Sequence, residues 1–164
     1  MSTVTVGQKA PGFELTDEDG KKYALEEALA RGPVLVAFFK VECPTCQYTL
    51  PFVERLYQQF RAQGVQIWGI AQDDARDSQR FAKEYGLTFP VLLDDYPYQV
   101  SREYGLHYVP TLFLIAPDGR VRLASDGFAK TDLLEMQKSL ANYFSLTPPA
   151  LFHTRDRVPE FKPG

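Results

Sequence analysis

The sequence predicts an α/β protein in which a central mixed β-sheet carries helices on both faces. Residues 34–39 (Val-Leu-Val-Ala-Phe-Phe) are apolar without interruption, which is typical of a central strand buried on both faces. Strand-like and helix-like patterns alternate from there to residue 93, which predicts mainly parallel strands joined by helices. Further on, Pro117-Asp118-Gly119 separates two strand-like segments and predicts a hairpin that adds antiparallel strands at one edge.

The other elements follow from hydrophobic periodicity and from residues that form turns or end helices. The turn-forming stretch 17–20 (Asp-Glu-Asp-Gly) predicts an N-terminal β-hairpin from the strands on either side of it. Gly64, Gly86 and Gly105 each follow a helical pattern, and Thr131 is the expected cap of the last helix. Strands are expected at residues 13–15, 21–24, 34–39, 65–71, 89–93, 111–115 and 120–125. Helices are expected at residues 25–30, 44 to about 63, 74–85, 98–104 and 131–144.

The composition indicates one globular domain followed by a tail. The chain has 164 residues, of which 45% are hydrophobic and 24% charged, and this is enough for a complete core. We expect the domain to span residues 1–144. Residues 145–164 contain several prolines and show little periodicity, which predicts an extended tail. We expect Leu151 and Phe152 to anchor this tail on the domain surface.

The charge pattern excludes two classes of partner. The net charge is −3, the pI is about 5.4, and the basic residues are spread along the chain, so neither nucleic acid nor an anionic membrane is an expected partner.

The first twelve residues lack the basic and apolar regions of a signal peptide, and no apolar run approaches a membrane span. We therefore expect a cytoplasmic protein.

The two cysteines of the chain lie in the motif Cys43-Pro44-Thr45-Cys46, between a predicted strand and a predicted helix. The thiolate form of cysteine is the nucleophile, and the unpaired N–H groups of a helical first turn stabilise it. With Cys43 at the N-cap, Pro44 takes the first helical position, and the N–H groups of Thr45 and Cys46 and the Thr45 hydroxyl are free to face the Cys43 sulfur. Cys46, covered by its own helix, is the expected resolving thiol.

Two other uses of such a motif fit the sequence less well. A structural zinc site needs a second closely spaced pair of ligands, and His107 and His153 are far apart in the sequence. A purely structural disulfide that closes so small a loop would restrain the unfolded chain little. A reversible redox couple is the expected function of the motif, and we expect no metal or organic cofactor.

From these residues the chain resembles a thioredoxin-fold protein of the TlpA-like and redoxin (AhpC/TSA-type) branch. The N-terminal segment 7–15 with Asp19-Gly20-Lys21 is similar to the hairpin of that branch. Pro51 stands five residues after Cys46, where the active-site helix of the family is kinked, and Val109-Pro110-Thr111 resembles the family's cis-proline loop. Residues 74–93 match the extra helix and strand that separate this branch from thioredoxin.

The resemblance implies further site residues. The proline loop would face the dithiol and expose the backbone of Val109, next to Pro110, for β-type pairing with an extended substrate. Two acidic positions of the family are replaced, by Ala37 and by Thr49, so no proton acceptor for Cys46 is assigned. Lys40 and Glu42 are the candidate tuning residues, because Lys40 would favour the Cys43 thiolate and Glu42 would oppose it.

The expected activity is thiol-disulfide exchange in the direction of a reductase. The substrate would be a protein disulfide or a small disulfide, the electron donor is not specified by the sequence, and the enzyme would be a monomer or a weak dimer. One alternative is a peroxiredoxin-like peroxidase with Cys43 as peroxidatic and Cys46 as resolving cysteine, with an antioxidant role. Lys40 and Val109 replace the threonine and arginine of that family, which disfavours it. Another alternative is a redox-gated protein-binding module.

Overall fold

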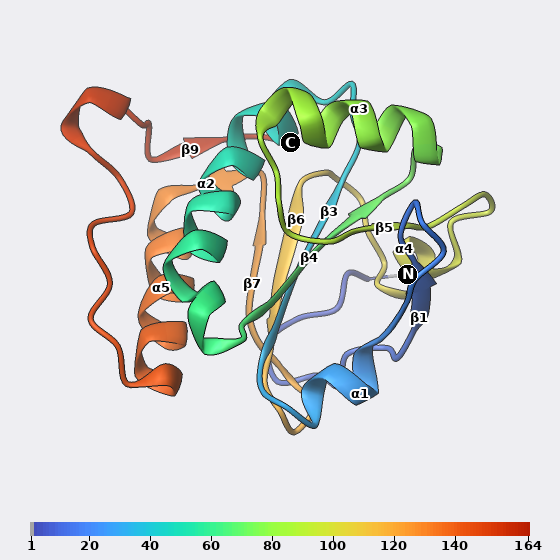
Figure 1. The fold of residues 1–164 in the computed structure, drawn as a ribbon, viewed down its shortest axis with the longest axis horizontal. Helices are drawn as coiled ribbons and strands as arrows, with labels where there is room; N and C mark the ends of the chain where they lie inside the picture. The colour runs from blue at the N-terminus through green and yellow to red at the C-terminus, as the bar shows by residue number, and fades with distance from the viewer. Residues whose placement is uncertain (1) are drawn as a thin grey trace.

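The computed structural model describes residues 2–164 and contains a seven-stranded mixed sheet with helices on both faces (Figure 1). The strand order is β2-β1-β5-β4-β3-β6-β7. These strands are β1 (Glu14–Thr16), β2 (Lys22–Ala24), β3 (Val34–Phe39), β4 (Gln66–Ala71), β5 (Val91–Leu93), β6 (Thr111–Ile115) and β7 (Val121–Asp126). The helices that cover them are α1 (Leu25–Leu29), α2 (Pro44–Phe60), α3 (Ala75–Tyr85), α4 (Gln99–Glu103) and α5 (Lys130–Phe144).

Strand β3 lies in the middle of the sheet, and all six of its residues are buried, as its apolar sequence predicts. The expectation of a mainly parallel sheet is wrong. β3 is parallel to β4 and β4 to β5, whereas the pairs β1–β2, β1–β5, β3–β6 and β6–β7 are antiparallel. The helical crossovers through α2 and α3 make the next strand run parallel to the one before it. The two hairpins make antiparallel pairs, and β6 enters the sheet antiparallel to β3.

The two faces of the sheet bury separate hydrophobic cores. Helices α2, α3 and α5 cover one face, with Leu50, Phe81 and Met136 among their buried residues. Helices α1 and α4 cover the other face, where Tyr104 and Trp68 are buried. Helices therefore lie on both faces, as expected from the sequence, and the α3–β5 unit adds a strand between β4 and the N-terminal hairpin.

The ends of the helices agree with the sequence in part. Asp74 caps α3 by accepting the N–H of Asp77 at 2.8 Å, and Gly86 ends that helix in the left-handed conformation at φ 68°. The cap expected at Thr131 is wrong, because α5 begins one residue earlier and its N-cap is Ala129, which makes no side-chain cap hydrogen bond. The preceding strand β8 (Phe128–Ala129) runs directly into α5, so this end of the helix is held by strand pairing.

Residues 145–164 return along α2 after α5 ends (Figure 1). Leu151 is 1% exposed in the core beneath α2, and the ring of Phe152 lies 5.0 Å from that of Phe52. Arg55 of α2 binds both carboxylate oxygens of Asp156, at 2.7 and 3.0 Å. The segment also contains the short elements η2 (Thr154–Asp156) and β9 (Phe161–Lys162), and β9 pairs with β8.

None of the helices within residues 2–164 combines the length and the apolar character needed to cross a membrane.

Candidate active site

Cys43 lies at the junction between β3 and α2, at the carboxyl end of the central strand. It is the N-cap of α2 with an extended backbone (φ −94°, ψ 113°), and Pro44 follows at the first helical position, as expected. The Cys46 N–H donates a hydrogen bond to the Cys43 sulfur over 3.0 Å. The half-buried Cys43 sulfur thus sits at the positive end of a 17-residue helix, where a thiolate is stabilised.

Cys46 lies one turn further along α2 and is fully buried. Burial raises the pKa of the Cys46 thiol well above its ordinary value, and the contact with Cys43 raises it further. A backbone hydrogen bond with Lys40 has the opposite but smaller effect. Cys46 therefore remains a protonated thiol in the reduced protein, covered by its own helix, whereas the Cys43 sulfur can be reached.

The loop before β6 faces the dithiol. The Val109–Pro110 peptide bond is cis, and the Cys43 thiol lies 3.4 Å from the carbonyl oxygen of Val109, to which it donates. The loop is held from behind, because the Gly127 N–H donates to the Pro110 carbonyl oxygen over 2.8 Å. Val109 and Pro110 thus lie beside Cys43, although 66 residues of chain separate Val109 from Cys43.

The sequence also predicts three polar residues near the dithiol: Thr45, Lys40 and Glu42. The expectation that the Thr45 hydroxyl faces the Cys43 sulfur is wrong, because this hydroxyl donates to the carbonyl oxygen of Pro163 over 2.6 Å. Thr45 precedes Cys46 in the first turn, and its side chain points outward, where the returning tail accepts the hydrogen bond. Lys40 and Glu42 are both exposed, so solvent screens their opposite charges.

The structure adds Asp73 to the site. Its carboxylate accepts the N–H of Val41, in the loop before Cys43, at 2.9 Å, and its negative charge contributes to the raised pKa of Cys46. By sequence alone, Asp73 is an ordinary turn residue before a helix. Asp73 follows β4, the parallel neighbour of β3, and carboxyl ends of parallel strands meet at one edge of a sheet, so this signal could have placed it near the dithiol.

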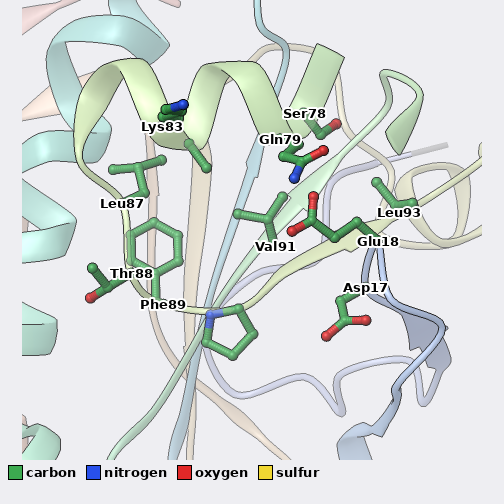
Figure 2. Close-up of a pocket in the computed structure, with 12 residues that line it drawn as sticks. Asp17, Glu18, Ser78, Gln79, Lys83, Leu87, Thr88, Phe89, Val91 and Leu93 are labelled. Carbon is green, nitrogen blue, oxygen red and sulfur yellow. The ribbon is translucent and has the colours of Figure 1, made fainter. Parts of the chain in front are cut away.

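A surface pocket of about 330 Å³ lies away from the dithiol, between α3, β5 and the turn after β1. Figure 2 shows the side chains of Glu18, Gln79 and Val91 along it, with Asp17 at its rim. Burial, together with the charges of Asp19 and Asp17, raises the pKa of Glu18. Neither cysteine lines this pocket, so it offers no thiol for the redox chemistry of the site.

The known proteins that are similar to this chain include thiol-disulfide oxidoreductases. The model of the AhpC/TSA family matches residues 6–124. The thiol-disulfide oxidoreductase ResA of Geobacillus thermodenitrificans is 32% identical over 141 residues, covering 85% of this chain and 80% of that protein. ResA of Bacillus subtilis is 34% identical over 120 residues, covering 73% of this chain and 66% of that protein. The chain thus spans 66–80% of the length of these two relatives.

Solved structures of similar shape agree with these relatives. A putative thiol:disulfide interchange protein DsbE from Chlorobium tepidum superposes with a TM-score of 0.74 at 29% identity, covering 85% of this chain and 99% of that one. A putative protein disulfide isomerase from Bacteroides thetaiotaomicron has a TM-score of 0.80 at 22% identity, over 88% of this chain and 95% of that one, and supports the thioredoxin-like fold. The chain belongs to the AhpC/TSA family and is a TlpA/redoxin-type thiol-disulfide oxidoreductase.

Proposed function

We propose that the enzyme reduces disulfides with Cys43 as the attacking thiol and Cys46 as the resolving thiol. The Cys43 thiolate attacks one sulfur of the substrate disulfide, which breaks the substrate S–S bond and forms a mixed disulfide. The Cys46 sulfur then attacks Cys43 and releases the second substrate sulfur, which takes up the proton that Cys46 loses. One dithiol is oxidised to a disulfide, and one substrate disulfide is reduced to two thiols.

The difference between the two thiols carries this proposal. The Cys43 sulfur is half-buried, accepts the Cys46 N–H and can be reached, whereas Cys46 is buried and its pKa is raised. A thiol that is accessible and stabilised as a thiolate reacts first with an external disulfide. A buried, protonated thiol next to it reacts only when the mixed disulfide places an electrophilic sulfur in contact with it.

Four residues would position the substrate. The backbone of Val109, held by Pro110, lies against the Cys43 sulfur and supports pairing with a polypeptide substrate in extended conformation. Pro44, which is exposed, and Thr45, which is half-buried, would form the opposite wall, in the first turn of α2. A substrate disulfide bound between these two walls would contact the Cys43 sulfur.

We further propose that the enzyme works in the reducing cytoplasm, as a monomer or weak dimer. A CxxC pair in such a compartment serves catalysis rather than crosslinking, and Cys43, Cys46 and Val109 contact one another within a single chain. The reduction potential of the Cys43/Cys46 couple, measured against glutathione, tests the direction of electron flow. A potential near or below the cytosolic value supports a reductase, whereas a much more oxidising potential would contradict this direction. Sedimentation analysis tests the oligomeric state.

Trapping experiments test the two roles. In a Cys46→Ser variant the resolving step is missing, so mixed disulfides between Cys43 and substrate should accumulate and survive non-reducing electrophoresis. The Cys43→Ser variant is the matched control and should trap nothing. In the wild-type protein, iodoacetamide should modify Cys43 before Cys46. Trapping by Cys43→Ser alone, or earlier alkylation of Cys46, would show that the roles are reversed.

A further inference from the structure

The end of the tail lies over the wall that the proposed function assigns to substrate. The carbonyl oxygen of Pro163 accepts the Thr45 hydroxyl at 2.6 Å, across 118 residues of chain. Gly164 lies so close to the loop before β6 that a side chain at this position would collide with the carbonyl oxygen of Val109. Residues 163 and 164 thus contact both walls of the site, and Figure 1 shows the chain ending beside the start of α2.

Strand pairing directs the tail to this position. In the antiparallel pair β8–β9, Phe128 lies opposite Lys162 and Ala129 lies opposite Phe161, and the Lys130 N–H donates to the Glu160 carbonyl oxygen over 3.0 Å. The ammonium of Lys162 lies 5.1 Å from the ring centre of Tyr48 on α2. The tail therefore reaches the site as an extended strand.

The pairing also connects the tail to the proline loop. Gly127 donates its N–H to Pro110, and its other side faces the tail so closely that a side chain there would collide with the Lys162 carbonyl oxygen. One residue thus touches both the loop that positions the substrate and the segment that lies over it.

The tail consists of a firmly held part and a weakly held end. Leu151 is buried, and Asp156 is bound by Arg55 through two hydrogen bonds, so the chain is fixed along α2 up to that point. Residues 160–164 are all exposed, and the contacts that hold them are short or at the surface: the two-residue pairing with β8, the Lys130–Glu160 ion pair, the Lys162 ammonium over the Tyr48 ring and the hydrogen bond from Thr45. This end can leave the site while the anchored part stays in place.

We propose that residues 161–164 determine substrate specificity by occupying the extended-peptide position of the site. The inference rests on the proposed function. A polypeptide substrate that pairs with Val109 must displace Gly164 and take the Thr45 hydroxyl from Pro163. A small disulfide needs only the Cys43 sulfur, which remains half-exposed with the tail in place. The docked tail therefore favours small disulfides, and polypeptides react with the undocked form.

Tethering makes the tail an effective competitor. A segment joined to its site by a short chain acts at an effective concentration on the order of millimolar, above the concentration of most substrates. Loosening the pairing with β8 should therefore accelerate the reaction with polypeptides selectively.

The test compares two probes that have the same leaving group. One is a ten-residue peptide whose single cysteine forms a mixed disulfide with 2-nitro-5-thiobenzoate, and the other is the same mixed disulfide of cysteamine. Each reaction breaks the probe S–S bond, forms a disulfide with Cys43 and releases the coloured thiolate, which absorbance records. The full-length reduced protein is compared with a Phe161→Gly/Lys162→Gly variant. A Thr147→Gly/Ala150→Gly variant is the matched control, because both residues are exposed in the same tail, next to the Pro149 carbonyl that binds Gln59 near the far end of α2.

Each glycine weakens a strand by an amount that corresponds to about two- to fivefold in an equilibrium constant, so the undocked population should rise about five- to thirtyfold. The peptide-to-cysteamine rate ratio should rise by up to the same factor in the Phe161→Gly/Lys162→Gly variant and stay within about twofold of wild type in the control. An unchanged ratio in a protein that reacts normally with cysteamine would overturn the specificity role of the tail. A wild-type protein that reacts with neither probe faster than a free thiol would instead overturn the proposed function.

A second measurement keeps the inference testable if the glycine variant changes the site itself. A synthetic peptide with the sequence of residues 158–164, added at millimolar concentration, should restore the wild-type rate ratio in the glycine variant. It should leave wild type unchanged, because the tethered tail already occupies the position. Failure of the added peptide to lower the raised ratio of the glycine variant would contradict docking as the cause of the change.

Discussion

The buried Cys46 thiol should make the stability of the reduced protein depend on pH in the alkaline range. Burial raises the pKa of Cys46 in the folded state, whereas the unfolded chain has an ordinary thiol pKa of about 8.5. The folded protein thus keeps the Cys46 proton at pH values where the unfolded chain loses it. This contribution to stability is complete below the unfolded pKa, and it declines as the pH rises toward the folded pKa.

The size of the effect follows from one proton. The slope is half its limiting value of about 1.4 kcal/mol per pH unit at the unfolded pKa and approaches that value above it, which gives a loss of about 1.6 kcal/mol between pH 8.5 and pH 10. Tyr104, whose pKa burial also raises, contributes only near and above the ordinary tyrosine value of about 10, so the measurement ends there. The assay is urea unfolding of the fully reduced protein at several pH values, followed by the fluorescence of Trp68.

Comparison of variants isolates the contribution of Cys46. The Cys46→Ala variant should be less stable near neutral pH because it leaves a small cavity. Over the same pH range, however, its free energy of unfolding should fall by about 1.6 kcal/mol less than that of wild type. The Cys43→Ser variant should keep most of the wild-type slope, since burial is the largest cause of the shift. Parallel pH profiles for wild type and Cys46→Ala would refute the conclusion that Cys46 is a buried, protonated thiol.

Three further predictions concern the tail and the chemistry. Leu151→Ala should lower the free energy of unfolding by about 2–4 kcal/mol in urea denaturation, because Leu151 is buried in the main core; a loss under about 0.5 kcal/mol would mean that the tail is not packed there. The Arg55 guanidinium holds the pKa of Asp156 well below its usual range, so the pair stabilises the fold above about pH 4 and less as the pH falls below it. Between about pH 5 and pH 3, the Tm of the Arg55→Met variant should therefore fall less than the Tm of wild type. Equal decreases in Tm for the two proteins would contradict this. Hydrogen peroxide should oxidise the reduced protein at the rate of a free thiol, because Lys40 and Val109 replace the expected donors; stopped-flow rates typical of peroxidases would reverse this assignment.

The sequence by itself determined the local parts of this site. The apolar run of β3, the proline after Cys43 and the spacing of the two cysteines place a thiol at the start of a helix. These features depend on contacts between residues within one turn or one strand, so periodicity and capping rules are sufficient to predict them. The caps at Asp74 and Gly86 were predictable for the same reason.

Features that join distant segments depended on the tertiary structure. The direction of β6, the approach of Asp73 to Cys46 and the extent to which Cys46 is buried follow from the order and register of the strands. The resemblance to a known family placed Val109 near Cys43, but the residues between them carry no such signal. The hydrogen bond between Thr45 and Pro163 was not predictable, because an exposed, proline-rich segment has no periodic pattern that selects its docking partner. Its position is decided by a short strand pairing and a few side-chain contacts that exist only after the core has formed.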